Sequence, residues 1–362
     1  MNLPDPRLYP RVNPQNPMIR QVMSLMTERD AELVAQKRAG LQQLMAELLM
    51  SKDHYGLNGA LTQAPSQDAW LTMWHALRVE VESPSAHDQQ SATVFAIPLV
   101  LVAGCKGETS LPSEIDGAAA LSLLREHGVI AANADAWISG ALLGPDVLAA
   151  ISPAQLAEWR ATITEAEKFP IDSAGSAIKV KDEAVVLRYL IGVAIQEKGA
   201  EPAIQLGGQV TSWGMPLANL ISEALKTDGV TLFPIPRTPL SWLAAQDVGR
   251  VTQLETRLQV MTSNALRSIR TKGRTPVVTV AAHENNEIRI TFSSKEDPER
   301  WEGYVWTLLP SDHVELIAQY VRELMLECRL EDLVFIENVQ PTLDTDGLPF
   351  FITAHIKPVV LQ

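Results

Sequence analysis

The sequence has few of the residues that mark several classes of protein. Only two of its 362 residues are cysteines, Cys105 and Cys328, and neither belongs to a C-x-x-C pair. A disulfide framework needs more cysteines, so we expect two buried thiols in a reducing compartment. Basic residues are also scarce, with 30 Lys and Arg against 43 Asp and Glu and a net charge of -13. That charge repels a polyanion and disfavours nucleic-acid binding.

Long hydrophobic runs are absent as well. The longest apolar stretch, 92–105, is interrupted by Thr93, Pro98 and Gly104. A membrane-spanning helix needs about 18 or more apolar residues, so this stretch predicts a buried strand with a bend. The residues that follow Met1 have neither the basic start nor the apolar segment of a secretory signal. The sequence therefore predicts a cytoplasmic protein without a membrane segment.

Motifs for cofactors and metals are incomplete. Gly207 and Gly208 fit neither G-x-G-x-x-G nor G-x-x-x-x-G-K-[ST], so they predict a turn. His283 begins a sequence like a zinc-protease motif, but no histidine stands four positions later. Residues 344–347 resemble part of a calcium loop, but Thr353 occupies the position of the required glutamate. We therefore predict no cofactor and no metal.

A catalytic alternative centres on one cysteine. Cys105 follows the apolar strand and precedes Lys106, whose positive charge favours the thiolate. His283 and His313 are the histidines that we would pair with this thiol as catalytic residues. The alternative hypothesis is therefore an enzyme of unrecognised type, with an inter-domain pocket near Cys105 and a histidine.

The first 50 residues favour interaction with other proteins. Residues 1–17 contain five prolines, which exclude a helix and predict an extended arm. Residues 18–50 show helical spacing of apolar residues, which predicts one long amphipathic helix or a helical pair. Methionine-rich faces adapt to different partners, although core packing explains these methionines too. The candidate partner-binding residues on the arm and the first helix are Leu3, Leu8, Tyr9, Val12, Met18, Met23 and Met26.

The rest of the chain predicts an α+β fold with several domains. We expect a helix-rich domain over 18–168 that contains the buried strand 92–105, and a mainly helical middle domain over 169–273. Within the middle domain, 182–196 predicts an apolar-rich helix and 239–269 a long helical stretch. Residues 274–362 predict a β-β-β-α-β-β unit, an antiparallel sheet packed on one helix, with a final hairpin formed by 333–339 and 350–356. In its strand 288–292, apolar residues alternate with Arg289 and Thr291, as in a half-exposed strand.

The functional hypothesis is a protein-interaction or assembly protein, a scaffold or subunit without catalytic activity, whose partners are other proteins or further copies of this chain. A basic run of Arg267, Arg270, Lys272 and Arg274 is the one local exception to the acidic character. It falls at the predicted end of a helix, where cations are favourable because of the helix dipole. The same run is the candidate contact for a phosphate, a partner or a nucleic acid.

Overall fold

The computed structural model describes residues 15–82, 90–162, 177–197, 200–205, 209–283, 287–330, 333–336, 342–343 and 349–350. These residues pack as two compact units. The amino-terminal unit comprises 15–61 and 72–253, and the carboxy-terminal unit comprises 62–71 and the described residues from 254 onward. Both contain helices together with largely antiparallel sheets, which confirms the predicted α+β class.

The chain between 17 and 50 forms two helices, the second of the two predicted alternatives. These two helices are α1 (Pro17–Thr27) and α2 (Ala31–Met50). Two further helices, α3 (His54–Thr62) and α4 (Gln67–Glu82), follow them in the chain. The break occurs because Asp30 caps α2: its carboxylate accepts hydrogen bonds from the main-chain N–H groups of Glu32 and Leu33. Asn16 caps α1 in the same way through the N–H of Met18.

A five-stranded sheet forms the centre of the amino-terminal unit. Its strand order is β2 (Asp135–Ile138), β3 (Ile178–Glu197), β1 (Gln90–Leu111) and β4 (Thr231–Pro236), and β5 (Leu240–Ser241) also pairs with β1. The buried strand predicted over 92–105 is confirmed as part of β1. β1 and β3 pair over most of their lengths, so segments that we assigned to separate domains, 18–168 and 169–273, share one sheet.

The helix predicted over 182–196 is wrong, because these residues form strand β3. Most of the strand from Val185 to Ile195 is buried, so its apolar residues do not alternate with polar ones. A continuous apolar run suits a strand that is covered on both faces as well as it suits a buried helix, and periodicity alone does not separate the two.

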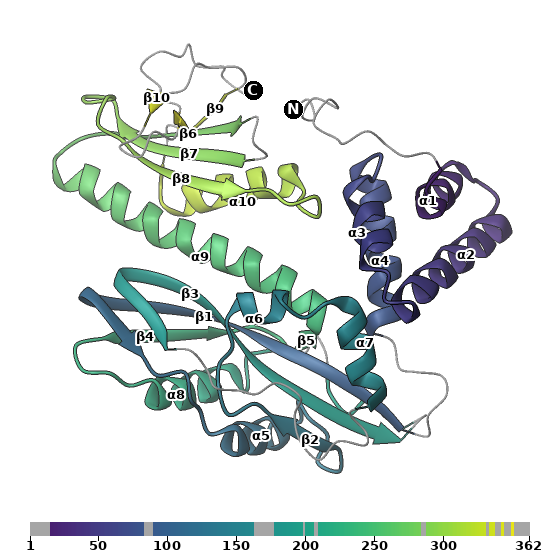
Figure 1. Cartoon of the computed structure of the whole chain (residues 1–362). Coiled ribbons are helices and arrows are strands. Elements are labelled where there is room, and N and C mark those ends of the chain that lie inside the picture. The colour runs from purple at the N-terminus through teal and green to yellow at the C-terminus, as the bar shows by residue number, and fades with distance from the viewer. Residues whose placement is uncertain are drawn as a thin grey trace. The chain divides into compact units, whose positions relative to one another are not determined.

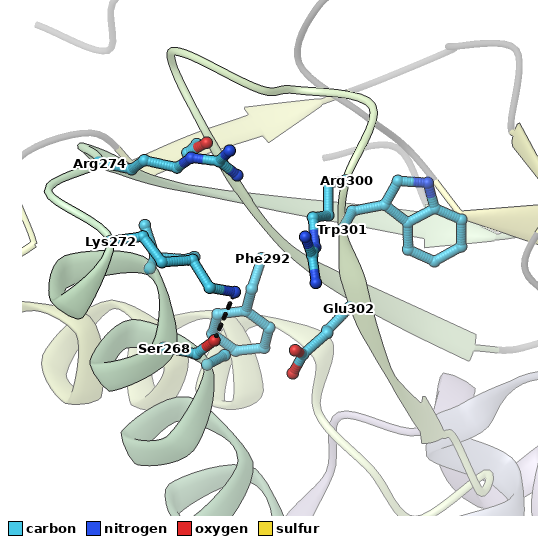
Figure 2. A pocket seen from close by; sticks show the side chains of 10 residues that line it. Ser268, Lys272, Arg274, Phe292, Arg300, Trp301 and Glu302 are labelled. Carbon is cyan, nitrogen blue, oxygen red and sulfur yellow. Dashed lines mark hydrogen bonds between the residues drawn. The ribbon is translucent and has the colours of Figure 1, made fainter.

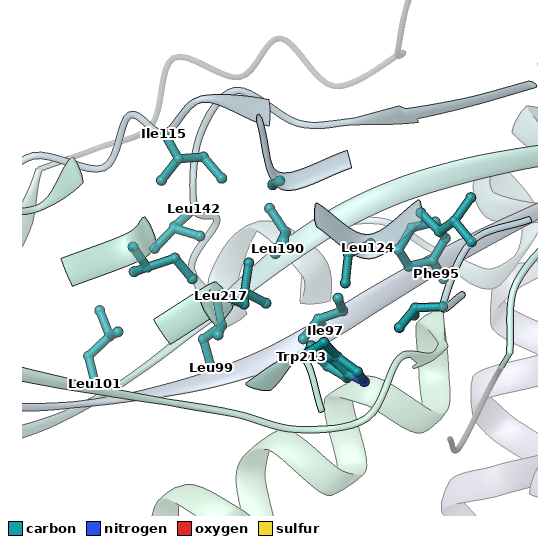
Figure 3. Packing of buried hydrophobic residues seen from close by; sticks show 14 of the residues in the cluster. Phe95, Ile97, Leu99, Leu101, Ile115, Leu124, Leu142, Leu190, Trp213 and Leu217 are labelled. Carbon is teal, nitrogen blue, oxygen red and sulfur yellow. The ribbon is translucent and has the colours of Figure 1, made fainter. Parts of the chain in front are cut away.

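Both faces of this sheet are covered. Phe95, Ile97 and Leu99 of β1 lie on one face, and Figure 3 shows them among the buried residues of the main hydrophobic cluster. The helices α5 (Gly117–Glu126) and α8 (Gly214–Ala224) cover that face (Figure 1).

The first half of α9 (Trp242–Thr271) covers the opposite face. There the Tyr189 hydroxyl donates to the Gln246 carbonyl at 3.5 Å, and the Gln253 amide donates to the Val185 carbonyl at 3.1 Å. Two shorter helices, α6 (Pro145–Ala149) and α7 (Pro153–Thr162), complete the unit.

The carboxy-terminal unit has a four-stranded sheet. The chain order is β6 (Pro276–His283), β7 (Glu287–Ser294), β8 (Glu302–Thr307), α10 (Val314–Glu327) and β9 (Leu333–Ile336), and the sheet order is β8-β7-β6-β9. β9 lies parallel to β6, so 333–336 do not pair with a hairpin partner as predicted. Instead β10 (Thr342–Leu343) pairs with β11 (Pro349–Phe350), and the rest of the predicted strand 350–356 lies outside the described residues.

The second half of α9 and helix α10 pack on one face of this sheet. The Tyr304 hydroxyl of β8 donates to the Leu254 carbonyl of α9 at 2.8 Å. The Tyr320 hydroxyl of α10 donates to the main-chain carbonyl of Glu255, also in α9, at 3.4 Å. The rings of Trp306 and Tyr320 meet edge to face, with centroids 6.2 Å apart. These contacts fix both helices against β8.

The prediction that β7 is half exposed is wrong. Arg289 is only 1% exposed and Thr291 is fully buried, although both lie on the face opposite Phe292. Burial of Arg289 is possible because its guanidinium pairs with the Glu287 carboxylate. Both faces of β7 are therefore buried. The polar residues alternate with the apolar ones because they lie on opposite faces, and not because one face is exposed to solvent.

Candidate functional site: a small basic cavity

The structure places Cys105 at the irregularity of the β1–β3 pairing between Gly104 and Glu108. Its thiol lies 3.3 Å from the Gly107 carbonyl and 3.5 Å from the Asp182 carbonyl. Within the described residues, no histidine makes a hydrogen bond with this thiol. Cys105 and Cys328 are both partly exposed, so the expectation of two buried thiols is wrong.

The two candidate histidines belong to the carboxy-terminal unit, whereas Cys105 belongs to the amino-terminal unit. His283 is the last residue of β6. His313 is the residue before α10, and its side chain makes no capping hydrogen bond. The described contacts thus bring none of the three catalytic candidates together.

The predicted partner-binding residues fall into three groups. Leu3, Leu8, Tyr9 and Val12 lie outside the described residues. Met18 is 2% exposed and packs in the core of the amino-terminal unit. Met23 and Met26, one helical turn apart on α1, are 46% and 43% exposed. Only these two of the three methionines are accessible to a partner.

A small cavity of about 80 Å³ lies at the carboxyl end of α9, beside the turn that joins β7 to β8. Figure 2 shows its side chains, which come from three parts of the chain. The lining residues are Ala265, Ser268, Ile269, Lys272, Arg274, Phe292, Ser294, Arg300, Trp301 and Glu302. Basic side chains line much of it, which is unusual for a chain of net charge -13.

The end of α9 positions the first two cations. Gly273 has a φ of +69°, the left-handed conformation that ends many helices. The N–H groups of Gly273 and Arg274 donate to the carbonyls of Arg270 and Ile269, which satisfies the end of the helix with main-chain bonds. The Lys272 ammonium is therefore not needed as a cap, and it lies 3.3 Å from the Ser268 hydroxyl at the cavity (Figure 2).

The turn between β7 and β8 is fixed to the end of α9. The Glu296 carboxylate accepts hydrogen bonds from the N–H and the hydroxyl of Thr275, each 2.8 Å long. These two bonds, the main-chain bond more than the side-chain bond, lower the pKa of Glu296 and keep it ionised. The connection before β6 and the turn after β7 are thereby held together.

The charges around the cavity leave a small positive excess. Arg274 pairs with Asp297, with an N–O distance of 2.8 Å. Arg300 forms no ion pair with another residue that the structure describes, and Glu302 stands beside it (Figure 2). Arg274 is engaged by Asp297 and lies near the Glu296 carboxylate, so the positive excess comes from the other lining residues, where Lys272 and Arg300 stand against Glu302 alone.

This arrangement suits one oxyanionic group. Guanidinium and ammonium groups donate hydrogen bonds but accept none, so the three cations of the cavity present only donors. Bonds from such donors to a carboxylate are shorter and stronger than bonds between neutral groups. The buried ring of Phe292 supplies an apolar wall, which weakens the screening by water.

The sequence identified two of these three cations. Lys272 and Arg274 belong to the predicted basic run, but Arg270 instead donates to the carbonyls of Cys328 and Arg329. Phe292 and Arg300 were not singled out as site residues. They reach the cavity only because β7 and β8 pair in one particular register, and no local signal in the sequence gives that register.

No group of three or more potential metal ligands occurs in the described parts of the chain. None of the described helices combines the length and the apolar character that crossing a bilayer requires. A comparison with protein-family models finds no match, and comparisons with curated proteins and with solved structures find none either.

Proposed function

We propose that this chain is a cytoplasmic protein-interaction protein, a scaffold or subunit of a larger assembly, which holds an acidic side chain of a partner protein in its basic cavity. One observation carries the proposal: Lys272 and Arg274 from the carboxyl end of α9, and Arg300 from the turn before β8, line a single small cavity. Arg274 is already paired with Asp297, so Lys272 and Arg300, which form no ion pair with the described residues, are the cations that favour an added anion.

The size and charge of the cavity favour a carboxylate over a larger anion. About 80 Å³ accommodates one small group and not a nucleotide or a sugar. The excess of one positive charge matches the single negative charge of an aspartate or glutamate side chain. Charged groups at an interface contribute chiefly to specificity and to the rate of association, which is what an assembly protein requires of such a site.

A second surface supports an interaction role. Met23 and Met26 are exposed side by side on α1 in the amino-terminal unit. Methionine side chains are flexible and polarizable, so they adapt to the shape of an apolar partner surface. Further copies of this chain are one source of the acidic side chain for the basic cavity, because the chain is itself rich in carboxylates.

The proposal is tested with a hexaglutamate peptide and the full-length protein. We expect saturable binding, measured by isothermal titration calorimetry, that weakens as salt rises because the contact is electrostatic. The double variant Lys272→Gln, Arg300→Gln removes two cavity cations with little change in side-chain size. We expect it to bind at least tenfold more weakly.

The matched control is the double variant Lys226→Gln, Arg20→Gln. It removes the same charge from exposed positions that do not line the cavity. Binding by this control should stay within twofold of the unaltered protein. Equal losses in both double variants would show that the peptide responds only to overall charge and would overturn the proposal, as would the absence of binding by the unaltered protein.

A further inference from the structure

A second cavity, of about 250 Å³, lies within the amino-terminal unit. It occurs where β1 begins and β3 ends, beside the first residues of α9. The lining residues are Val81, Glu82, Thr93, Val94, Leu156, Gln196, Pro202, Ala203, Ile204, Ser241 and Trp242. The cavity is open to solvent on one side, so a small molecule can enter it from the surface.

Most of the cavity wall is apolar. Val94, Leu156 and Trp242 are buried, and each is at most 5% exposed. An apolar cavity of about 150 Å³ stays dry and takes up benzene. The cavity here is larger, so an apolar body of one or two fused rings is the matching size.

One carboxylate acceptor, that of Glu82, stands at the wall. The side chain of Glu82 is 14% exposed, and its carboxylate accepts the Leu243 N–H at 2.9 Å and the Arg78 Nε–H at 3.3 Å. A carboxylate accepts about four hydrogen bonds, so Glu82 retains acceptor capacity. Arg78 balances its charge, which favours a neutral donor over a cation as the additional partner.

Two hydroxyls add adaptable polar contacts. Within the described residues, neither the Thr93 hydroxyl nor the Ser241 hydroxyl forms a hydrogen bond with another residue. The side-chain carbonyl of Gln196 accepts the Ala203 N–H, which fixes the orientation of that amide. The wall thus combines a few oriented polar groups with a largely apolar surface, the composition typical of small-molecule sites.

We propose that this cavity binds a small neutral molecule with an apolar body of one or two rings and one N–H or O–H donor directed at Glu82. The inference does not depend on the basic cavity, which belongs to the other unit. Indole is a suitable probe because it has two fused rings and one N–H donor. 1-Methylindole is the matched probe, since it has nearly the same shape but lacks the donor.

The first experiment measures the binding of both probes to the full-length protein by saturation-transfer NMR and calorimetry. Indole should bind saturably. 1-Methylindole should bind about tenfold more weakly, because it loses a hydrogen bond to a charged acceptor. No saturable binding of indole would overturn the site, and equal binding of both probes would overturn the role of Glu82 as acceptor.

The second experiment fills the cavity. Ala203→Leu and Thr93→Met each place a larger side chain in it, and each should weaken indole binding at least tenfold. The matched control is Thr109→Met, the same substitution on β1 at a position outside the cavity, which should leave binding unchanged. Thr93 is partly exposed, so Thr93→Met decides the test if the buried Ala203→Leu variant fails to fold. Unaltered binding in Thr93→Met, or an equal loss in Thr109→Met, would place indole elsewhere and overturn the proposal.

Discussion

Gly192 of β3 lies directly opposite Phe95 of β1, and the Phe95 ring occupies the space that a Cβ atom at position 192 would need. Both residues lie on the face of the sheet that α5 and α8 cover, where Phe95 is fully buried. The absence of a side chain at 192 therefore leaves the space that the Phe95 ring occupies against the neighbouring strand.

Gly192→Ala should destabilise the protein. Overpacking of a filled core costs about 1–3 kcal/mol, because neighbouring side chains and backbone must shift. Urea unfolding followed by circular dichroism measures the change. Gly104→Ala is the control, since it lies on β1 with no atom within 4 Å of its added Cβ. A similar loss in both variants would contradict the role of the Phe95 ring.

Tyr304→Phe should weaken the attachment of β8 to α9. The variant loses the part-buried hydrogen bond to the Leu254 carbonyl, and the loss of such a bond costs about 1 kcal/mol. Thermal unfolding at pH 7 measures the loss. Tyr55→Phe, at a side chain 94% exposed, should leave stability unchanged.

The same tyrosine makes stability sensitive to alkaline pH. Burial raises the pKa of Tyr304 above its ordinary value of 10.0. The contribution of Tyr304 to the free energy of unfolding is therefore complete below pH 10. It is lost as the pH rises further, because the tyrosine hydroxyl then ionises in the unfolded chain but not in the folded one. Between pH 9 and about 11 the Tyr304→Phe variant should lose less stability than the unaltered protein. Parallel losses would count against this assignment.

Glu28→Gln should change the response to acid. The Lys37 ammonium lies 2.7 Å from the Glu28 carboxylate, and this bond, with the N–H groups of Asp30 and Arg29, lowers the pKa of Glu28 to about 2. A lowered pKa gives stability that is complete above 4.5, the ordinary value, and is lost as pH falls toward 2. The stability difference between the two proteins should therefore shrink over that interval in urea titrations. A difference that is constant with pH would contradict the pairing.

Deletion of residues 1–14 should reduce self-association. The arm carries the predicted contacts Leu3, Leu8, Tyr9 and Val12, while Asn16, which caps α1, is retained. Light scattering of both proteins measures the mass of the particle. We expect an oligomer before deletion and a smaller particle after it. A monomer in both cases would contradict self-association through the arm.

The sequence alone determined the elements that depend on local bonds. Asp30 begins α2, Gly273 ends α9, and the apolar spacing of α10 predicts its buried face. These signals are local because a cap or a helical face involves residues only a few positions apart. The class of the fold followed from them.

Only the tertiary structure decided which apolar run became a strand and which side chains met. β3 is a strand because β1 pairs with it along its length, and Arg289 is buried because Glu287 neutralises it. Likewise Arg300 joins Lys272 through the pairing of β7 with β8, and Glu82 meets the first turn of α9 across 161 positions of chain. Strand register and long-range packing are cooperative properties of the folded chain, so neighbouring residues in the sequence do not encode them.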